Sequence, residues 1–285
     1  MKLAISLCYW LLSKLVDLIL RPLRKGTPTT CVVLCYHGIP EVHRERFARQ
    51  MDLLLRWATP VRADFMDTLA VGKHLAAVTF DDGLVSVRDQ ALPELAKRNI
   101  PATLFIPTGY LGKKCTWMRV DQLPLSKRDR EQLLHDTVMD SDQLRAICSD
   151  RVLLGSHGVR HVHLTSLTEA ETKKELHDSK AELENILGQR IQLFSFPRGE
   201  YDRHILQWAA DAGYKRVFSI EPKFSSGEPF EFLTGRVTVE PTDWNLEFFL
   251  KLGGGYHWMQ VVAPLKNFLR RIAVRNKERG HRFKG

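Results

Sequence analysis

The chain contains few cysteines, and their arrangement excludes two common uses of that residue. The five cysteines are scattered along the sequence, without the paired spacing of a zinc-binding motif. Cys31 and Cys35 fall in one expected strand, where four residues span roughly 13 Å, too far for a disulfide bond. The sequence therefore shows no disulfide framework, and this favours a reducing compartment.

The sequence also lacks internal repeats, low-complexity segments and a small-residue cleavage site after its first apolar segment. The missing cleavage site argues against a signal peptide, and the missing repeats exclude a repeat architecture. With 285 residues, 44% of them hydrophobic, the chain is long enough to bury one large core. We expect a single globular domain over residues 27–257.

Positive charge is unevenly distributed, although the formal net charge is only +9. Residues 258–285 are predicted to form a basic C-terminal helix or tail. This segment either binds an anionic surface or is simply exposed to solvent. The tail has no interleaved aromatic residues and matches no nucleic-acid-binding module, so no nucleic-acid partner is expected. The sequence does not predict an oligomeric state.

The N-terminal segment, residues 1–26, predicts an amphipathic helix. On a helical wheel, the polar residues of segment 2–25 fall within an arc of roughly 140°, and the remaining arc is apolar. A helix that spans a membrane would bury Lys14 and Asp17 in hydrocarbon, at about 2.5–3.5 kcal/mol each. We therefore expect residues 2–25 to lie peripherally on a membrane, with the cytoplasmic face favoured; the alternative is a helix packed on the protein's own core.

Short apolar runs alternate with helical patterns through the rest of the chain. Helices are expected at 44–57, 87–98, 168–187 and 203–212. The predicted strands are 31–36, 75–81, 102–106, 151–156, 191–196, 215–220 and 234–239. This alternation predicts an α/β fold, a distorted (β/α) barrel of about seven parallel strands, with functional residues at the carboxyl ends of the strands. The polar stretch 109–140 interrupts the pattern and predicts a surface loop or a lid.

Two adjacent carboxylates, Asp81 and Asp82, follow the strand at 75–81 and precede Gly83. In a regular strand they would point to opposite faces, but a sharp turn at the glycine lets both face one pocket. His157 and His161 follow another expected strand and stand four residues apart. One carboxylate with two imidazoles can hold a divalent metal, and the second carboxylate is then free to act as a base. This pattern predicts a metal-dependent hydrolase.

His37 ends the first predicted strand and could reach the same rim; the alternative is a histidine that is hydrogen-bonded in a turn. His163 could substitute for a histidine of the pair, or it could point to solvent.

Three segments together resemble the polysaccharide deacetylase family, also called the NodB-homology or carbohydrate esterase family. They are TFDDG at 79–83, GSHGVRH at 155–161 and FSFPRGEYD at 194–202. An early Tyr-His-Gly at 36–38 is similar to the branch that acts on poly-N-acetylglucosamine of exopolysaccharides. The resemblance covers roughly residues 31–250 and implies the barrel fold.

The resemblance also implies roles for individual residues. It makes Asp81 the catalytic base and His37 the general acid, and it implies a divalent ion, most simply Zn²⁺. It implies substrate contacts from the third segment and the early motif. The implied metal ligands are Asp82, His157 and His161, and the implied substrate-binding residues are Pro197, Arg198 and Tyr36.

Three positions depart from the family pattern. Gly158 stands where a serine or threonine usually steadies the histidine loop. Ser195 replaces an arginine that often pairs with the catalytic aspartate, and Arg198 occupies a usual aromatic position.

The implied activity is metal-dependent removal of N-acetyl groups from amino sugars of a polysaccharide or lipid-linked glycan. One alternative is an amidase that acts on a small cyclic amide. The other is a catalytically impaired homologue that only binds carbohydrate.

Overall fold

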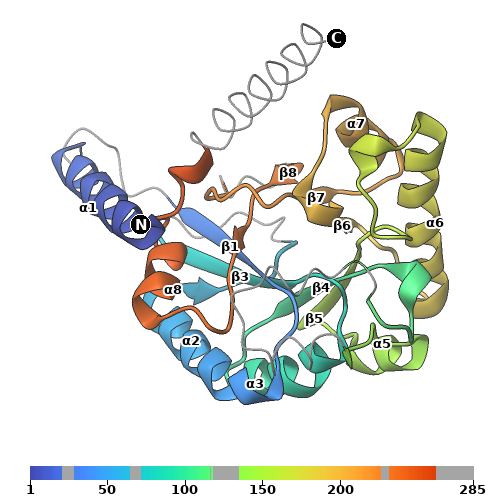
Figure 1. Ribbon diagram of the computed structural model, residues 1–285, viewed down its shortest axis with the longest axis horizontal. Coiled ribbons are helices and arrows are strands. Elements are labelled where there is room, and N and C mark those ends of the chain that lie inside the picture. The colour runs from blue at the N-terminus through green and yellow to red at the C-terminus, as the bar shows by residue number, and fades with distance from the viewer. Residues whose placement is uncertain (21–28, 65–71, 116, 118–134, 226–230, 261–285) are drawn as a thin grey trace, which may run out of the picture.

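The computed structural model describes residues 1–20, 29–64, 72–115, 117, 135–225 and 231–260. Its centre is a nine-stranded sheet in which every pairing between named strands is parallel (Figure 1). The strand order is β8-β7-β6-β5-β4-β3-β1-β9, and β2 also pairs with β3. The strands are β1 (Thr30–Tyr36), β2 (Thr59–Pro60), β3 (His74–Phe80), β4 (Ala102–Ile106), β5 (Val152–Ser156), β6 (Leu193–Ser195), β7 (Arg216–Phe218), β8 (Leu233–Thr234) and β9 (Val237–Thr238).

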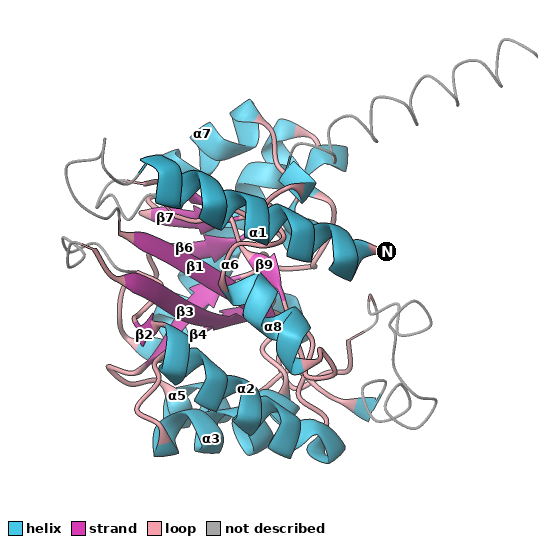
Figure 2. Cartoon of the chain, turned by 90° about the vertical axis from the view of Figure 1, so that its left-hand side faces the viewer, coloured by secondary structure: helices cyan, strands magenta, loops and turns pink. Residues whose placement is uncertain are grey.

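Helices surround this sheet (Figure 2). They are α1 (Lys2–Leu20), α2 (Arg44–Trp57), α3 (Leu92–Lys97), α5 (Ser141–Ile147), α6 (Glu169–Leu187), α7 (Arg203–Asp211) and α8 (Asn245–Leu252). Short helical turns are η2 (Glu41–His43), η3 (Val87–Ala91), η4 (Thr108–Tyr110), η6 (Leu164–Ser166) and η7 (Pro197–Gly199). Local sequence explains several boundaries: Thr168 and Glu171 form a capping box that starts α6, and Gly188 ends that helix in the left-handed region.

Two hydrophobic clusters line the two faces of the sheet, because successive side chains of a strand point to opposite sides. The larger cluster contains β1 residues such as Val32 and Leu34 together with residues of the surrounding helices. The smaller contains Cys31, Val33 and Phe105 with other strand and loop residues, and none from a helix. The smaller cluster therefore fills the face that the curled sheet encloses.

The sheet curls because one short segment joins both of its ends. β8 pairs with β7 at one end of the strand order, and β9 pairs with β1 at the other. Only Gly235 and Arg236 separate β8 from β9. The seam of the barrel therefore lies at residues 233–238, and Arg236 sits in it.

The fold predicted from the sequence is confirmed, with differences in detail. The expected strand at 234–239 consists of two short strands, β8 and β9, and the expected helix at 87–98 begins with the π-helical turn η3. β2, α5 and α8 were not expected, because each is short. The predicted basic tail falls largely on residues 261–285, which lie outside the described residues, as do 21–28 and much of the predicted loop at 109–140.

Candidate active site

Asp81 and Asp82 lie where β3 ends, and the chain turns there as the sequence predicts. The turn begins one residue before the glycine: Asp82 has φ 69° and Gly83 has φ 58°. Aspartate tolerates this left-handed region better than most residues. As a result, His157 Nε2 lies 3.9 Å from Asp81 Oδ2 and 3.9 Å from Asp82 Oδ1, so both carboxylates face one site.

Asp81 is held by a buried arginine from the seam. Arg236 Nη1 and Nη2 donate to the two carboxylate oxygens of Asp81, each at 2.7 Å. The Oγ atom of Ser195 and the Sγ atom of Cys35 also donate to Asp81 Oδ2, at 3.3 Å and 3.5 Å. Burial pushes the pKa of Asp81 upward, but Arg236, with a smaller contribution from His157, outweighs burial and holds the pKa below its ordinary value.

Arg236 was not predicted as a site residue. Its Nη2 atom also donates to Ser195 Oγ at 2.7 Å, so it occupies the surroundings of the serine that replaces the family's usual arginine. Phe105 and Phe218 lie beneath its guanidinium, whose carbon is 5.3 Å and 5.9 Å from the two ring centroids. The available signal was a charged residue inside a run otherwise expected to be a buried strand, because buried arginines are almost always paired.

The two histidines lie on a loop that follows β5. His157 Nδ1 donates to the backbone oxygen of Ser195 at 2.8 Å, and this fixes the tautomer whose Nε2 lone pair faces Asp82. His161 has φ 52°, and its Nε2 lies 3.4 Å from Asp82 Oδ1. Burial, helped by His157, lowers the pKa of His161 to about 2, so its imidazole is neutral.

The buried carboxylate of Glu175, on α6, anchors this histidine loop. Its Oε2 atom accepts backbone N–H bonds from Val159 at 2.7 Å and Arg160 at 3.0 Å, and its Oε1 accepts from the Arg160 side chain. A Cβ at Gly158 would lie 3.2 Å from Glu175 Oε2. Glu175 thus supports the loop beside the position where the family usually has a hydroxyl.

The donor set of Asp82, His157 and His161 fits a divalent cation. One ligand atom of each residue lies within 4.8 Å of the others, and all three residues are buried. Two ligands bound tetrahedrally to Zn²⁺ at about 2.0–2.2 Å would be roughly 3.4 Å apart, close to the spacing between Asp82 Oδ1 and the histidines. Burial raises the pKa of Asp82, against the effects of His37 and His157, and a bound cation would favour its charged form.

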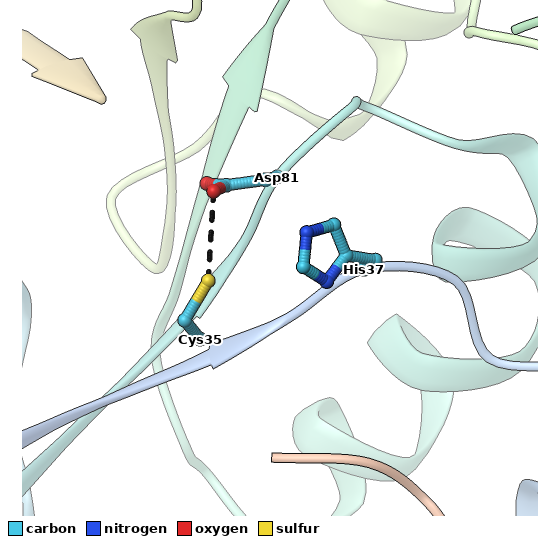
Figure 3. A group of neighbouring side chains, drawn as sticks. All are labelled: Cys35, His37 and Asp81. Atoms are coloured by element: carbon cyan, nitrogen blue, oxygen red, sulfur yellow. Dashed lines mark hydrogen bonds between the residues drawn. The ribbon is translucent and has the colours of Figure 1, made fainter. Parts of the chain in front are cut away.

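A second candidate group consists of Cys35, His37 and Asp81 (Figure 3). A His37 ring nitrogen, the Cys35 sulfur and an Asp81 oxygen lie within 4.8 Å of one another. This group fits a cation poorly, because Arg236 already binds both oxygens of Asp81 and would repel the ion. Burial also raises the pKa of Cys35 well above its ordinary value, so its sulfur remains a thiol.

The 109–140 stretch contributes one described side chain to the site. Trp117 Nε1 donates to Asp82 Oδ1 at 3.1 Å, and the indole stacks on His161 with ring centroids 4.4 Å apart. This part of the stretch therefore covers the candidate cation site.

The expected substrate-binding residues have different positions. Pro197 is buried beside Gly158, whereas Arg198 is exposed and has φ 60°. Tyr36 contradicts the expectation: it is fully buried between the sheet and α2, and its hydroxyl donates to Gln50 at 2.9 Å. Tyr36 follows Cys35, which faces the enclosed side with Asp81, so strand alternation turns Tyr36 away from the site.

His163 lies outside the candidate cation group. It is about half exposed, and its Nδ1 contacts Glu200 Oε2 at 2.8 Å.

Comparison with known proteins gives consistent matches. The family model described as Polysaccharide deacetylase matches residues 69–217, a range that includes both carboxylates and both histidines. YxkH of Bacillus subtilis (strain 168), described as an inferred polysaccharide deacetylase, is 24% identical over 225 residues, which cover 75% of this chain and 73% of YxkH.

Solved structures share the fold. IcaB from Ammonifex degensii has a TM-score of 0.61 at 24% identity and covers 79% of this chain and 100% of its own. The Streptococcus pyogenes deacetylase PplD, solved in complex with acetate, has a TM-score of 0.62 at 20% identity and covers 79% of this chain and 99% of its own. The curled parallel sheet is thus shared with deacetylases.

Proposed function

Because the chain belongs to the polysaccharide deacetylase family, a family of hydrolases that act on carbon–nitrogen bonds other than peptide bonds, we propose that it removes N-acetyl groups from amino sugars. The substrate is a polysaccharide or a lipid-linked glycan. The products are acetate and a free amino sugar.

One observation carries this proposal: two adjacent carboxylates have opposite electrostatic surroundings. Asp81 pairs with Arg236, and its pKa is lowered; Asp82 faces two histidines, and burial raises its pKa. Neighbouring titratable groups whose pKa values are pushed apart are typical of sites that divide acid–base work between them. This contrast supports Asp81 as the base and Asp82 as a metal ligand.

Asp82, His157 and His161 would hold a divalent ion, most simply Zn²⁺. When bound there, such an ion would polarise the acetamide carbonyl and lower the pKa of water. Asp81 accepts a proton from the attacking water at Oδ1, because among the described residues this oxygen accepts a hydrogen bond only from Arg236 and retains a second lone pair. His37 donates a proton to the departing amine nitrogen.

The segment after β6 supplies the remaining substrate contacts. We assign Pro197 and Arg198 to one wall of the glycan-binding groove. Arg198 is exposed, and its charge contributes to the low pKa of His161, which supports a position near the candidate cation site.

We also place this activity at a membrane surface, with residues 2–25 as the membrane contact and the cytoplasmic face favoured. α1 is long and apolar enough to cross a membrane, with a mean hydropathy of 1.8, and almost none of it is buried.

Acetate release from N-acetylglucosamine oligomers, with and without a chelator, tests the activity. We expect release that stops with chelator and returns with added Zn²⁺. Ring opening of a cyclic ureide, without acetate release from any glycan, would instead indicate an amidase.

Variants at the two carboxylates test the assigned roles. Asp81→Asn should lower kcat by about 10²–10⁴-fold, the usual effect of losing a general base, and should leave metal content unchanged. Asp82→Ala should lose the metal. Asp142→Asn, which changes an aspartate with a 93% exposed side chain on α5, is the matched control and should alter neither property. Full turnover by Asp81→Asn would refute the assignment of the base.

A further inference from the structure

α1 belongs to the folded domain, because one of its faces packs on the neighbourhood of α8. Ser6 is fully buried, and its hydroxyl accepts a hydrogen bond from Trp258 Nε1 at 2.9 Å. The Trp10 ring meets Phe249 of α8 edge-on, with centroids 5.3 Å apart. Figure 1 shows α1 beside α8 at one side of the molecule.

The opposite face of α1 is apolar and exposed, which reverses the usual arrangement of a surface helix. At 100° per residue, its exposed aliphatic side chains fall within roughly half of the helix circumference, and Ser6 and Trp10 lie on the other half. Six of these side chains, which we call the outer strip, are 43% to 64% exposed: Leu11, Leu12, Leu15, Val16, Leu18 and Ile19. A contiguous apolar surface of this kind marks an interaction site.

The chemistry around α1 matches an anionic lipid surface. Lys14 is exposed at the edge of the strip, with its Nζ 5.9 Å from the centroid of the Trp10 ring. Trp57, 50% exposed, meets Phe249 edge-on at 5.1 Å, and the Arg56 guanidinium lies 5.7 Å from its ring. Tryptophan and basic side chains beside an apolar face are typical of segments at the membrane interface.

A spanning arrangement fits these contacts less well. To cross a bilayer, α1 would have to leave Trp258 and Phe249 and carry Lys14 into hydrocarbon. Lying in the plane of the surface keeps both contacts and leaves Lys14 among the headgroups.

We propose that α1 remains docked on α8 and lies in the plane of an anionic membrane surface, with the outer strip in the lipid and Trp57 as a second contact. This inference deepens the membrane location given above and rests on it. It does not depend on the catalytic roles.

Flotation of the purified full chain with phosphatidylcholine vesicles, with and without phosphatidylglycerol, tests the proposal. We expect binding to the anionic vesicles. Leu12→Glu/Leu15→Glu should weaken it by about 100-fold or more, because two apolar contacts are lost. Trp57→Ser should weaken it by about tenfold. Val42→Glu, at an aliphatic residue that is 54% exposed outside α1, is the matched control and should bind normally.

The exposed thiol of Cys8 reports on the lipid-facing side of α1. A water-soluble thiol reagent should modify Cys8 in the free protein and react more slowly once vesicles are present, while the half-buried Cys148 keeps its reactivity. If Cys8 reacts equally fast in the free protein and in the vesicle-bound protein, the outer strip does not face the lipid.

Three other results would overturn the proposal in distinguishable ways. Resistance to an alkaline carbonate wash would mean that α1 spans the membrane, which leaves the membrane location intact. The protein could instead form a dimer in the absence of lipid, and Leu12→Glu/Leu15→Glu could dissociate it. That result would mean that a second copy of the chain covers the outer strip. Absence of vesicle binding would remove the membrane location itself, whereas acetate release in solution would still test the catalytic proposal separately.

Discussion

The orientation of Asp81 depends mainly on one side chain, Arg236. Two N–H groups of a planar guanidinium bind both carboxylate oxygens, a geometry that fixes the carboxylate plane. Both partners are almost completely buried, so neither can exchange the other for water. Removing one partner of such a pair leaves an uncompensated charge at a cost of about 3–5 kcal/mol.

We therefore predict that Arg236→Lys and Arg236→Met lower kcat much more than they lower the metal content. Lysine retains the charge but cannot reproduce the two parallel hydrogen bonds, so kcat should fall by about 10²-fold while metal content stays near that of the unmodified protein. Methionine should also lower the free energy of unfolding. Steady-state kinetics, metal analysis and chemical denaturation measure these effects.

Arg216→Lys provides the matched control, because Arg216 is also buried in a strand of the barrel. It should affect stability rather than kcat. Unchanged kcat in Arg236→Met would show that Asp81 needs no arginine partner.

At the scale of elements, the histidine loop depends on α6. Glu175 accepts two backbone N–H groups of the loop, so the loop that carries two candidate metal ligands is tied to a capped helix. The loop needs this support because Gly158 has φ 77° and offers no hydroxyl.

Glu175→Gln should weaken metal binding. The amide has a single oxygen and no charge, so it cannot maintain all the bonds to Val159 and Arg160 at full strength. Loss of such a support around metal ligands typically costs 10–100-fold in affinity, and we expect about 10-fold. Competition with a chromophoric chelator measures the affinity. Glu182→Gln, on the exposed side of the same helix, should bind normally; equal affinity in both variants would contradict a role for Glu175.

The sequence predicted those elements and residues whose signals are local. α2 begins and ends where its apolar periodicity predicts, and Asp81, Asp82 and His157 meet because each follows a buried strand of one parallel sheet. Arg236 could not be predicted in the same way. Its partner is 155 residues away, and the two meet only when the sheet closes.

The position of Tyr36 differs from the prediction for a related reason. The Tyr-His-Gly motif is continuous in the sequence, but in a strand neighbouring side chains point to opposite faces. A one-residue difference decides whether a side chain faces the site or the helices.

At the scale of the whole molecule, closure of the barrel and orientation of the base depend on the same segment. β8 and β9 join opposite ends of the sheet, and Arg236 lies between them. Any change that opens this seam should therefore alter the orientation of the Asp81 carboxylate, even if it leaves the candidate metal ligands in place.

Gly235→Ala tests this coupling. An added Cβ would lie 2.2 Å from the backbone oxygen of Glu221 and 2.6 Å from Lys223 Cγ, so the seam must shift to admit it. We expect the free energy of unfolding to fall by about 1–3 kcal/mol, as for other overpacked sites, and kcat to fall with it because Arg236 moves with the seam.

Gly188→Ala separates this effect from a general cost of replacing glycine. Gly188 has φ 65°, but a Cβ there meets nothing within 4 Å, so the change should lower stability by about 1 kcal/mol without altering kcat. Comparing the two variants at a temperature where both are folded measures catalysis apart from unfolding. If Gly235→Ala loses stability but keeps its kcat, Asp81 is oriented independently of the seam, and the arginine acts only as a counter-charge.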